Sequence, residues 1–224
     1  MFLKKGRKVI FTKMVYIKSI DKNILPYYIS PFKDELFSSW FCRLSVKHNL
    51  KPQSFIQNYF DYKIPFWNRD IDLVGKKGII DFFLNHTTMS IDEIKNLFLD
   101  KYTGLAFEHL NPNGFSYNIL KLGINHRKRN RKGVLYCPKC LSNNPYYKTS
   151  WRLQTSLICY NCNEYLRDSC EKCNSPIAFH RLYISDNRPT MSYPSLNYCY
   201  KCKSDLSIQY SIEKPSELEL SYQS

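Results

Sequence analysis

The sequence of 224 residues contains no apolar run of the roughly 20 residues that a helix needs to cross a bilayer. Its first residues, MFLKKGRKVIFTKM, also lack the apolar stretch of about 7–15 residues and the small-residue cleavage site of a secretory signal. The first absence excludes a membrane-spanning protein, and the second argues against export. We therefore expect a reduced, cytoplasmic protein.

The motifs of several common catalytic sites are missing as well. There is no P-loop, no G-x-S-x-G and no H-E-x-x-H. Asn125-His126 precedes a cysteine pair and keeps a zinc-stabilised nuclease of the His-Asn-His type as an alternative. However, the chain has only five histidines, and none forms a second position near His126 that could hold a catalytic metal. The sequence therefore predicts a protein that acts by binding and is not an enzyme.

Cysteine is where the sequence is rich, because eight of its nine cysteines fall into four C-x-x-C pairs near the C-terminus. Four thiolates are the ligand set of a tetrahedral structural zinc site, so eight predict two zinc ions. The eighteen residues between Cys140 and Cys159 match the spacing of a zinc ribbon. The predicted ligands are Cys137, Cys140, Cys159 and Cys162 for the first ion, and Cys170, Cys173, Cys199 and Cys202 for the second.

Other arrangements of the eight thiols fit the same sequence. In a cross-brace, alternate C-x-x-C pairs would share an ion. A disulfide framework fits such pairs poorly and would need an oxidising compartment. A catalytic zinc keeps an open position and usually has three protein ligands, so two complete sets of four cysteines favour structural ions.

Positive charge is concentrated outside the cysteine-rich part. The chain carries 33 Lys and Arg against 19 Asp and Glu, a net charge of +14, and residues 1–136 alone hold 23 against 11. A dense basic run lies just before the first cysteine pair, and such a run gains affinity for DNA by releasing counterions from phosphates. A solvated linker is the alternative. The predicted DNA-contacting residues are Arg127, Lys128, Arg129, Arg131 and Lys132.

Apolar periodicity predicts several helices in the first half of the chain. One covers 34–48, a second follows Pro52, a third covers 76–85, and a fourth begins at Ser90, where Glu93 completes a capping box. A helix, a short polar turn and a second helix fit a helix-turn-helix and fit any small bundle equally well. We expect a mainly α, helix-turn-helix-like domain followed by two small zinc-ribbon-type modules. The expected segments are an arm (1–30), the helical domain (31–125), a basic linker (126–136), two zinc ribbons (137–169 and 170–210) and a tail (211–224).

Two stretches of sequence together resemble a known family. The first is P-x-x-x-E-x-x-x-S-W-x-x-R-L, with Pro31, Glu35, Ser39, Trp40, Arg43 and Leu44. The second is YCPKCLSNNPYYKTSWRLQTSLICYNCNEYLRDSCEKC. Both resemble the TniQ/TnsD family of target-selection proteins from DNA transposons, over roughly residues 26–180. The family commonly has C-x-x-H at the second knuckle where this chain has Cys159 and Cys162, and zinc accepts either ligand.

The resemblance implies an adaptor that joins a target-recognising factor to an AAA+ ATPase regulator, which recruits the transposase. Some short members of the family act beside an RNA-guided effector. A stand-alone DNA-binding regulator that uses zinc ribbons and the basic run is the alternative. Arg43 lies at the edge of the apolar face of the first helix, where its guanidinium could bind a partner's carboxylate or phosphate, or could pair with a carboxylate of its own domain.

Overall fold

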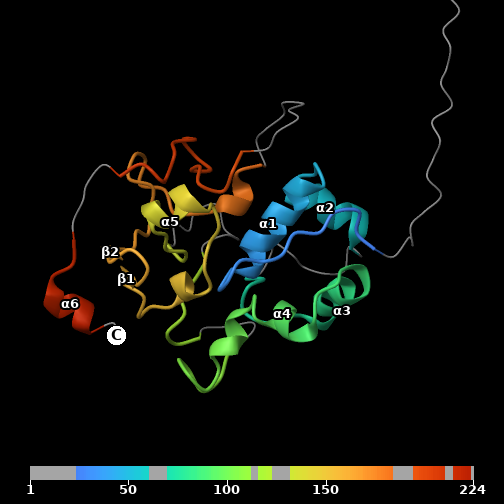
Figure 1. Ribbon diagram of the computed structural model, residues 1–224, viewed down its shortest axis with the longest axis horizontal. Coiled ribbons are helices and arrows are strands. Elements are labelled where there is room, and N and C mark those ends of the chain that lie inside the picture. Colours follow the sequence, from blue (N-terminus) through green and yellow to red (C-terminus); the bar gives the residue numbers. More distant parts are fainter. Residues whose placement is uncertain are drawn as a thin grey trace, which may run out of the picture.

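The structure is a computed structural model that describes residues 24–60, 70–111, 116–122, 132–183, 194–209 and 214–222. These residues are mostly helical with few strands, as Figure 1 shows. Residues 126–131 of the basic run and most of the predicted arm lie outside them. The elements are α1 (Phe37–Lys47), α2 (Pro52–Tyr59), α3 (Lys77–His86), α4 (Ile91–Lys95), η1 (Leu99–Tyr102), α5 (Pro138–Asn143), η2 (Ser150–Arg152), β1 (Ile158–Cys159), β2 (Glu164–Tyr165), η3 (Phe179–Arg181) and α6 (Glu217–Ser221).

Helices α1–α4 enclose a core of aromatic side chains. Phe37 stacks on Phe98 with ring centroids 4.7 Å apart, and Trp40 meets Phe83 edge-on at 4.8 Å. Phe41 and Phe55 complete the fully buried centre. The apolar positions that recur along α1 are those that the sequence pattern predicted to face inward.

The first helix ends where predicted but begins later. Asn49 closes it with φ 55°, a left-handed conformation that asparagine tolerates and that is common just after a helix. At the other end Asp34 has φ 61° and Leu36 is extended, so the helix starts at Phe37 and not at Asp34. Asp34 and Glu35 therefore do not lie in the first turn. The anion at this helix end is instead Asp72, which accepts a hydrogen bond from the backbone N–H of Ser38 at 2.7 Å.

The capping box of the fourth helix is present as predicted, with Ser90 and Glu93 bonded reciprocally. The helix itself ends at Lys95, after five residues. Ile91, its first residue, is 44% exposed, whereas Ile94 is buried. Helix α3 packs against α4. That this pair forms a helix-turn-helix that reads DNA stays a prediction.

The cysteine-rich part has a core of its own, which it shares with α1. Tyr147 stacks on Phe179 with centroids 4.3 Å apart, and Trp151 packs against Tyr147 edge-on. Leu36 and Cys42 belong to this second core and Val46 packs against it, whereas the first core contains Phe37, Trp40, Phe41 and Leu44. Figure 1 accordingly shows α1 between α2–α4 on one side and α5 with the β1–β2 hairpin on the other. One helix thus serves both halves of the molecule.

A seam of backbone pairing joins the two halves beside this helix. Leu36 donates its N–H to the carbonyl of Tyr147 at 2.8 Å, and Thr149 donates to the carbonyl of Asp34 at 2.8 Å. These bonds flank an antiparallel bridge between Glu35 and Lys148. The segment before α1 is thereby a short strand partner of residues 147–149. We refer to residues 34–36 and 147–149 together as the seam.

A second close approach brings together two described residues that lie on either side of the basic run in the sequence. A Cβ atom on Gly133 would lie 2.2 Å from the backbone oxygen of Lys121, closer than any side chain could come. Gly133 is therefore required by this contact between two backbones. Lys121 and Gly133 lie directly against each other, on either side of residues 123–131.

No helix among the described residues combines the length and apolar character that crossing a membrane would require.

Candidate metal centres and the polar seam

The eight paired cysteines gather into two groups of four, in the order in which they occur along the chain. Cys137, Cys140, Cys159 and Cys162 form the first group, and Cys170, Cys173, Cys199 and Cys202 form the second. Within each group all sulfur atoms lie within 4.8 Å of one another. The structure therefore has the sequential pairing and not the cross-brace.

The spacing of the sulfurs fits a tetrahedral metal ion. Cys140 Sγ lies 3.5 Å from both Cys159 Sγ and Cys162 Sγ, and the second group has Sγ–Sγ distances of 3.7 Å. A regular tetrahedron with metal–sulfur distances of about 2.3 Å has edges of about 3.8 Å. A disulfide would need about 2.05 Å, and every cysteine is free. Both groups could thus hold a metal ion through four thiolates.

Three of the four C-x-x-C turns share one backbone geometry. The residue after the second cysteine takes a left-handed conformation, with φ 52° at Asn163, 52° at Asn174 and 59° at Lys203. The chain then returns antiparallel to itself in the same register each time, pairing Ile158 with Tyr165, Ser169 with Pro176 and Tyr198 with Asp205. Two asparagines at these positions agree with the tolerance of that residue for positive φ.

The remaining knuckle, at Cys137 and Cys140, is helical. Pro138 occupies the first position of α5, where its missing N–H costs no hydrogen bond. The carbonyl of Cys137 accepts the N–H of Leu141 at 3.0 Å and starts the helix. The first group therefore combines a helix end with a hairpin, whereas the second group combines two hairpins.

Glu35 and Arg43, both quoted from the family motif, form a buried polar clasp at the seam. Glu35 is 1% exposed and accepts hydrogen bonds from Phe32 N at 2.9 Å, Ser39 Oγ at 2.9 Å and Arg43 Nη1 at 2.5 Å. The guanidinium of Arg43 also lies over the ring of Phe32, 4.2 Å from its centroid. Arg43 thus makes the ion pair within its own domain that was the alternative to partner binding. Its role toward a partner stays a prediction.

Asp34 is the other hub of the seam. Its carboxylate accepts hydrogen bonds from Lys101 Nζ at 2.8 Å, Ser150 Oγ at 2.6 Å and the hydroxyl of Thr149. Burial alone would raise the pKa of Asp34, but Lys101 and the two hydroxyls outweigh it and hold the pKa below its ordinary value. The carboxylate of Asp34 thereby links η1 of the helical half to residues 149–150 of the cysteine-rich half.

Sequence reasoning missed the carboxylate partners of Arg152. This arginine is fully buried and contacts Asp70 Oδ2 at 2.5 Å and Asp72 Oδ2 at 3.4 Å. Burial and the neighbouring Asp70 raise the pKa of Asp72, and the Arg152 guanidinium opposes them. Since Asp72 also binds the N-terminus of α1, Arg152 connects that helix end to the cysteine-rich half. No local pattern links 70–72 to 152, so only the structure could find this contact.

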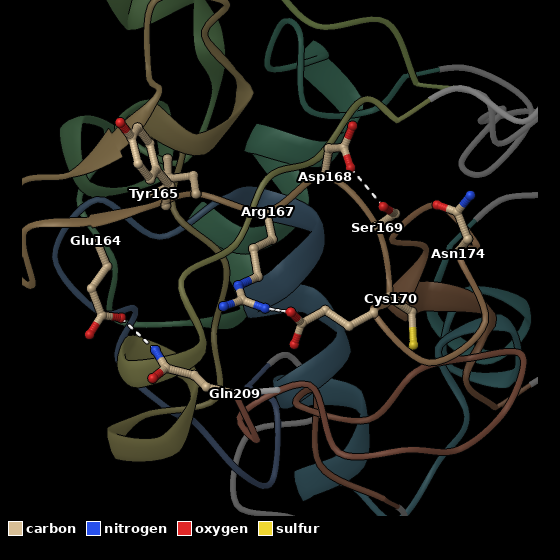
Figure 2. A pocket seen from close by; sticks show the side chains of 10 residues that line it. Glu164, Tyr165, Arg167, Asp168, Ser169, Cys170, Asn174 and Gln209 are labelled. Carbon is tan, nitrogen blue, oxygen red and sulfur yellow. Dashed lines mark hydrogen bonds and ion pairs between the residues drawn. The ribbon is translucent and has the colours of Figure 1, made fainter. Parts of the chain in front are cut away.

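The polar cleft in Figure 2 lies beside β2 and the third knuckle, and its walls are paired with one another. Glu164 accepts from Gln209 Nε2 at 2.6 Å, and Arg167 pairs with Glu171. Asp168 accepts from Ser169 Oγ at 2.7 Å and pairs with Lys132 at 3.1 Å. Lys132 is the one residue of the predicted DNA-contacting set that lies within the described part of the chain.

These features define a class: a helical protein whose second half could be fastened by metal ions and whose two halves meet at a buried polar seam. A family model described as TniQ matches residues 26–161, more than half of the chain. The chain belongs to the TniQ family, and the resemblance seen in the sequence is confirmed. The match contains the Glu35–Arg43 clasp and ends between Cys159 and Cys162, so the second cysteine group lies beyond it. A search of curated proteins found no match.

Membership of this family implies a role in target selection for transposition. The family generally consists of non-catalytic adaptors, which agrees with the absence of catalytic motifs from the sequence.

The clasp predicts pH-dependent stability for Arg43→Ala. Burial raises the pKa of Glu35 above its ordinary value of 4.5, and Arg43 opposes that rise. When folding raises the pKa of a carboxyl group, the folded state loses stability as pH rises from the pKa in the unfolded chain toward the pKa in the folded protein. Without Arg43 the pKa of Glu35 in the folded protein rises further. We expect urea denaturation to show a loss of about 2 kcal/mol at pH 8 and a clearly smaller loss at pH 6, where Glu35 can take up a proton.

Lys47→Ala is the matched control, because it removes the same charge from an exposed position on the same helix. Its effect should be small and equal at both pH values. If Arg43→Ala lowers the free energy of unfolding by the same amount at pH 6 and pH 8, the charge of Glu35 does not depend on Arg43.

Proposed function

We propose that this protein is a non-catalytic adaptor that links a target-site recognition factor to a DNA-bound AAA+ ATPase regulator and so directs transposon insertion. The observation that carries the proposal is the TniQ match over residues 26–161, which includes the whole seam. The recognition factor is an RNA-guided or DNA-binding targeting complex. The protein acts in the cytoplasm, where thiolates remain reduced and able to bind metal.

The two cysteine groups each hold one structural zinc ion in this proposal. Four thiolates at tetrahedral spacing leave no open position for a substrate or a water molecule, so the ions crosslink the chain and take no part in chemistry. The two-residue strands β1 and β2 contribute few backbone bonds. Metal binding therefore supplies a large share of the free energy that keeps the knuckles folded.

Elemental analysis of the purified protein should give about two zinc ions per chain. Cys140→Ser removes one thiolate of the first group and should lower the content to about one, with unfolding of the two knuckles of that group. Cys42→Ala is the control, because Cys42 is buried in α1 and belongs to neither group. It should keep both ions and lose only about 1 kcal/mol of stability. One zinc ion in the unmodified chain, or disulfides after reducing purification, would contradict the assignment.

DNA contact through the basic run is the second part of the proposal. The backbones of Lys121 and Gly133, which flank this run in the sequence, lie against each other in the folded protein. Lys132 pairs with Asp168 at 3.1 Å and is left unchanged in the test. Arg127, Lys128, Arg129 and Arg131 are therefore the residues to test.

Changing these four residues to Ala should weaken duplex binding and flatten its dependence on salt. Each lost phosphate contact lowers the log–log slope by about 0.9, so we expect a reduction of about 3. The control replaces four exposed lysines elsewhere, Lys77, Lys95, Lys139 and Lys172, and removes the same net charge. Fluorescence anisotropy at several salt concentrations gives both slopes. If the two quadruple variants behave alike, the run contributes only net charge.

The ATPase-binding surface in this proposal is the segment 24–32. This segment lies along α1: Trp40 Nε1 donates to the carbonyl of Ile29 at 2.9 Å, and the His48 ring bonds to the carbonyl of Tyr27 at 2.8 Å. It therefore covers part of the surface of α1. Ile24 and Tyr27 are each 54% exposed, and Phe32, which is 37% exposed, has the guanidinium of Arg43 over its ring. Exposed aromatic and arginine side chains are typical of residues that dominate binding energy.

A pull-down with the AAA+ ATPase encoded nearest to this gene, in the presence of DNA and ATP, tests the adaptor directly. We expect binding that needs both nucleotide and DNA. Exchanging Ile24 and Tyr27 together for Ala should reduce it at least tenfold, whereas Tyr117→Ala, at a residue that is 75% exposed on another part of the chain, should not. Tight recognition of one DNA sequence by this chain alone, without ATPase binding, would support the stand-alone regulator instead.

A further inference from the structure

The second cysteine group has two serine hydroxyls against its sulfur atoms. Ser175 Oγ lies 3.0 Å from Cys173 Sγ and 3.4 Å from Cys199 Sγ. Ser204 Oγ lies 3.0 Å from Cys202 Sγ and 3.3 Å from Cys170 Sγ. Together the two hydroxyls contact all four sulfurs of the group, one from each hairpin.

The backbone explains why both serines reach the sulfurs. Each follows the second cysteine of its knuckle by two positions, after the residue with left-handed φ. That residue turns the chain back, and the serine carbonyl then accepts the N–H of the first cysteine of the same knuckle. Cys170 donates to Ser175 at 2.9 Å, and Cys199 donates to Ser204 at 2.8 Å. Each serine is thus fixed directly opposite a ligand.

The first group has the same spacing but different chemistry. The hairpin position equivalent to the serines is Glu164, which pairs with Cys159 in β1–β2 and turns its carboxylate to Gln209. The helical knuckle does have a serine two residues after Cys140. However, Ser142 lies in α5, where the helix points it away from the sulfurs and leaves it exposed. The described contacts of the first group's sulfurs include no hydroxyl.

We propose that Ser175 and Ser204 are positioning residues for the metal ion of the second group, and that they make it the more slowly exchanging of the two ions. The inference rests on the zinc assignment proposed above. Four thiolates around a divalent ion leave two negative charges in excess. A hydroxyl that donates to a thiolate disperses this charge and holds the sulfur in place. Each hydroxyl has one proton, so it donates to the nearer sulfur, that of Cys173 or Cys202.

Zinc release into a chromogenic chelator tests the proposal. The unmodified chain should release its two ions in a faster and a slower phase. In the double variant Ser175→Ala and Ser204→Ala the slower phase should accelerate about tenfold, the lower end of the effect of such hydrogen-bond partners on metal affinity. The faster phase should not change. Ser142 has the same spacing from a ligand but no contact with a sulfur atom, so Ser142→Ala should leave both phases unchanged. The single variant Ser204→Thr keeps a hydroxyl at this position and retains Ser175, so its slower phase should also be unchanged.

Cobalt substitution separates a direct effect on sulfur from a loss of folding. Removing a hydrogen bond makes a thiolate a stronger donor, so the sulfur-to-cobalt charge-transfer band of the double variant should move to lower energy. Release rates and a band that match those of the unmodified chain would overturn the proposal. Elemental analysis distinguishes this outcome from failure of the zinc assignment: a chain with fewer than two zinc ions refutes both, and a chain with two refutes only the role of the serines.

Discussion

The pairing of residues 34–36 with 147–149 is the contact on which the rest of the structure depends. The two segments are more than one hundred residues apart, and each is too short to be stable alone. Their pairing places α1 where its two faces enter two different cores, and it brings the hydroxyl of Ser39 to the backbone N–H of Tyr147 at 3.0 Å. If this pairing were lost, Leu36 and Cys42 would leave the core of the cysteine-rich half together.

Buried charge is concentrated at this junction. Glu35, Asp72 and Arg152 are each at most 1% exposed, and all three lie where the two halves meet. An ion pair of this kind stabilises a protein little more than apolar side chains of equal volume would, but removing one partner strands the other. The arrangement therefore favours one alignment of the halves over others. It also explains why the family motif spaces Glu35, Ser39 and Arg43 four residues apart, since one helix face must present both donors to a single carboxylate.

Sequence reasoning succeeded where the determinant is local. The period of α1, the asparagine after it, the Ser90–Glu93 box and the grouping of eight cysteines are all set within a few residues. Sequence reasoning failed where contacts with residues far away in the sequence determine the structure. The start of α1 is fixed by Asp34 and Asp72, whose bonds run to residues 149–150 and 38. The second core was not foreseen, because Tyr147, Phe179 and Tyr183 show no periodicity until the knuckles bring them together. The basic run and the partner contacts remain predictions.

The contact between Lys121 and Gly133 has a consequence for how members of this family could diversify. A segment whose two ends already touch needs only a turn to join them, and the entropy of closing a loop grows by only about 0.6 kcal/mol for each doubling of its length. Lengthening the connection between these two residues therefore adds little to the entropy cost of folding. A difference in the length of this connection between relatives would cost little chain entropy, and the connection offers an insertion point for a tag or a foreign binding module on this scaffold.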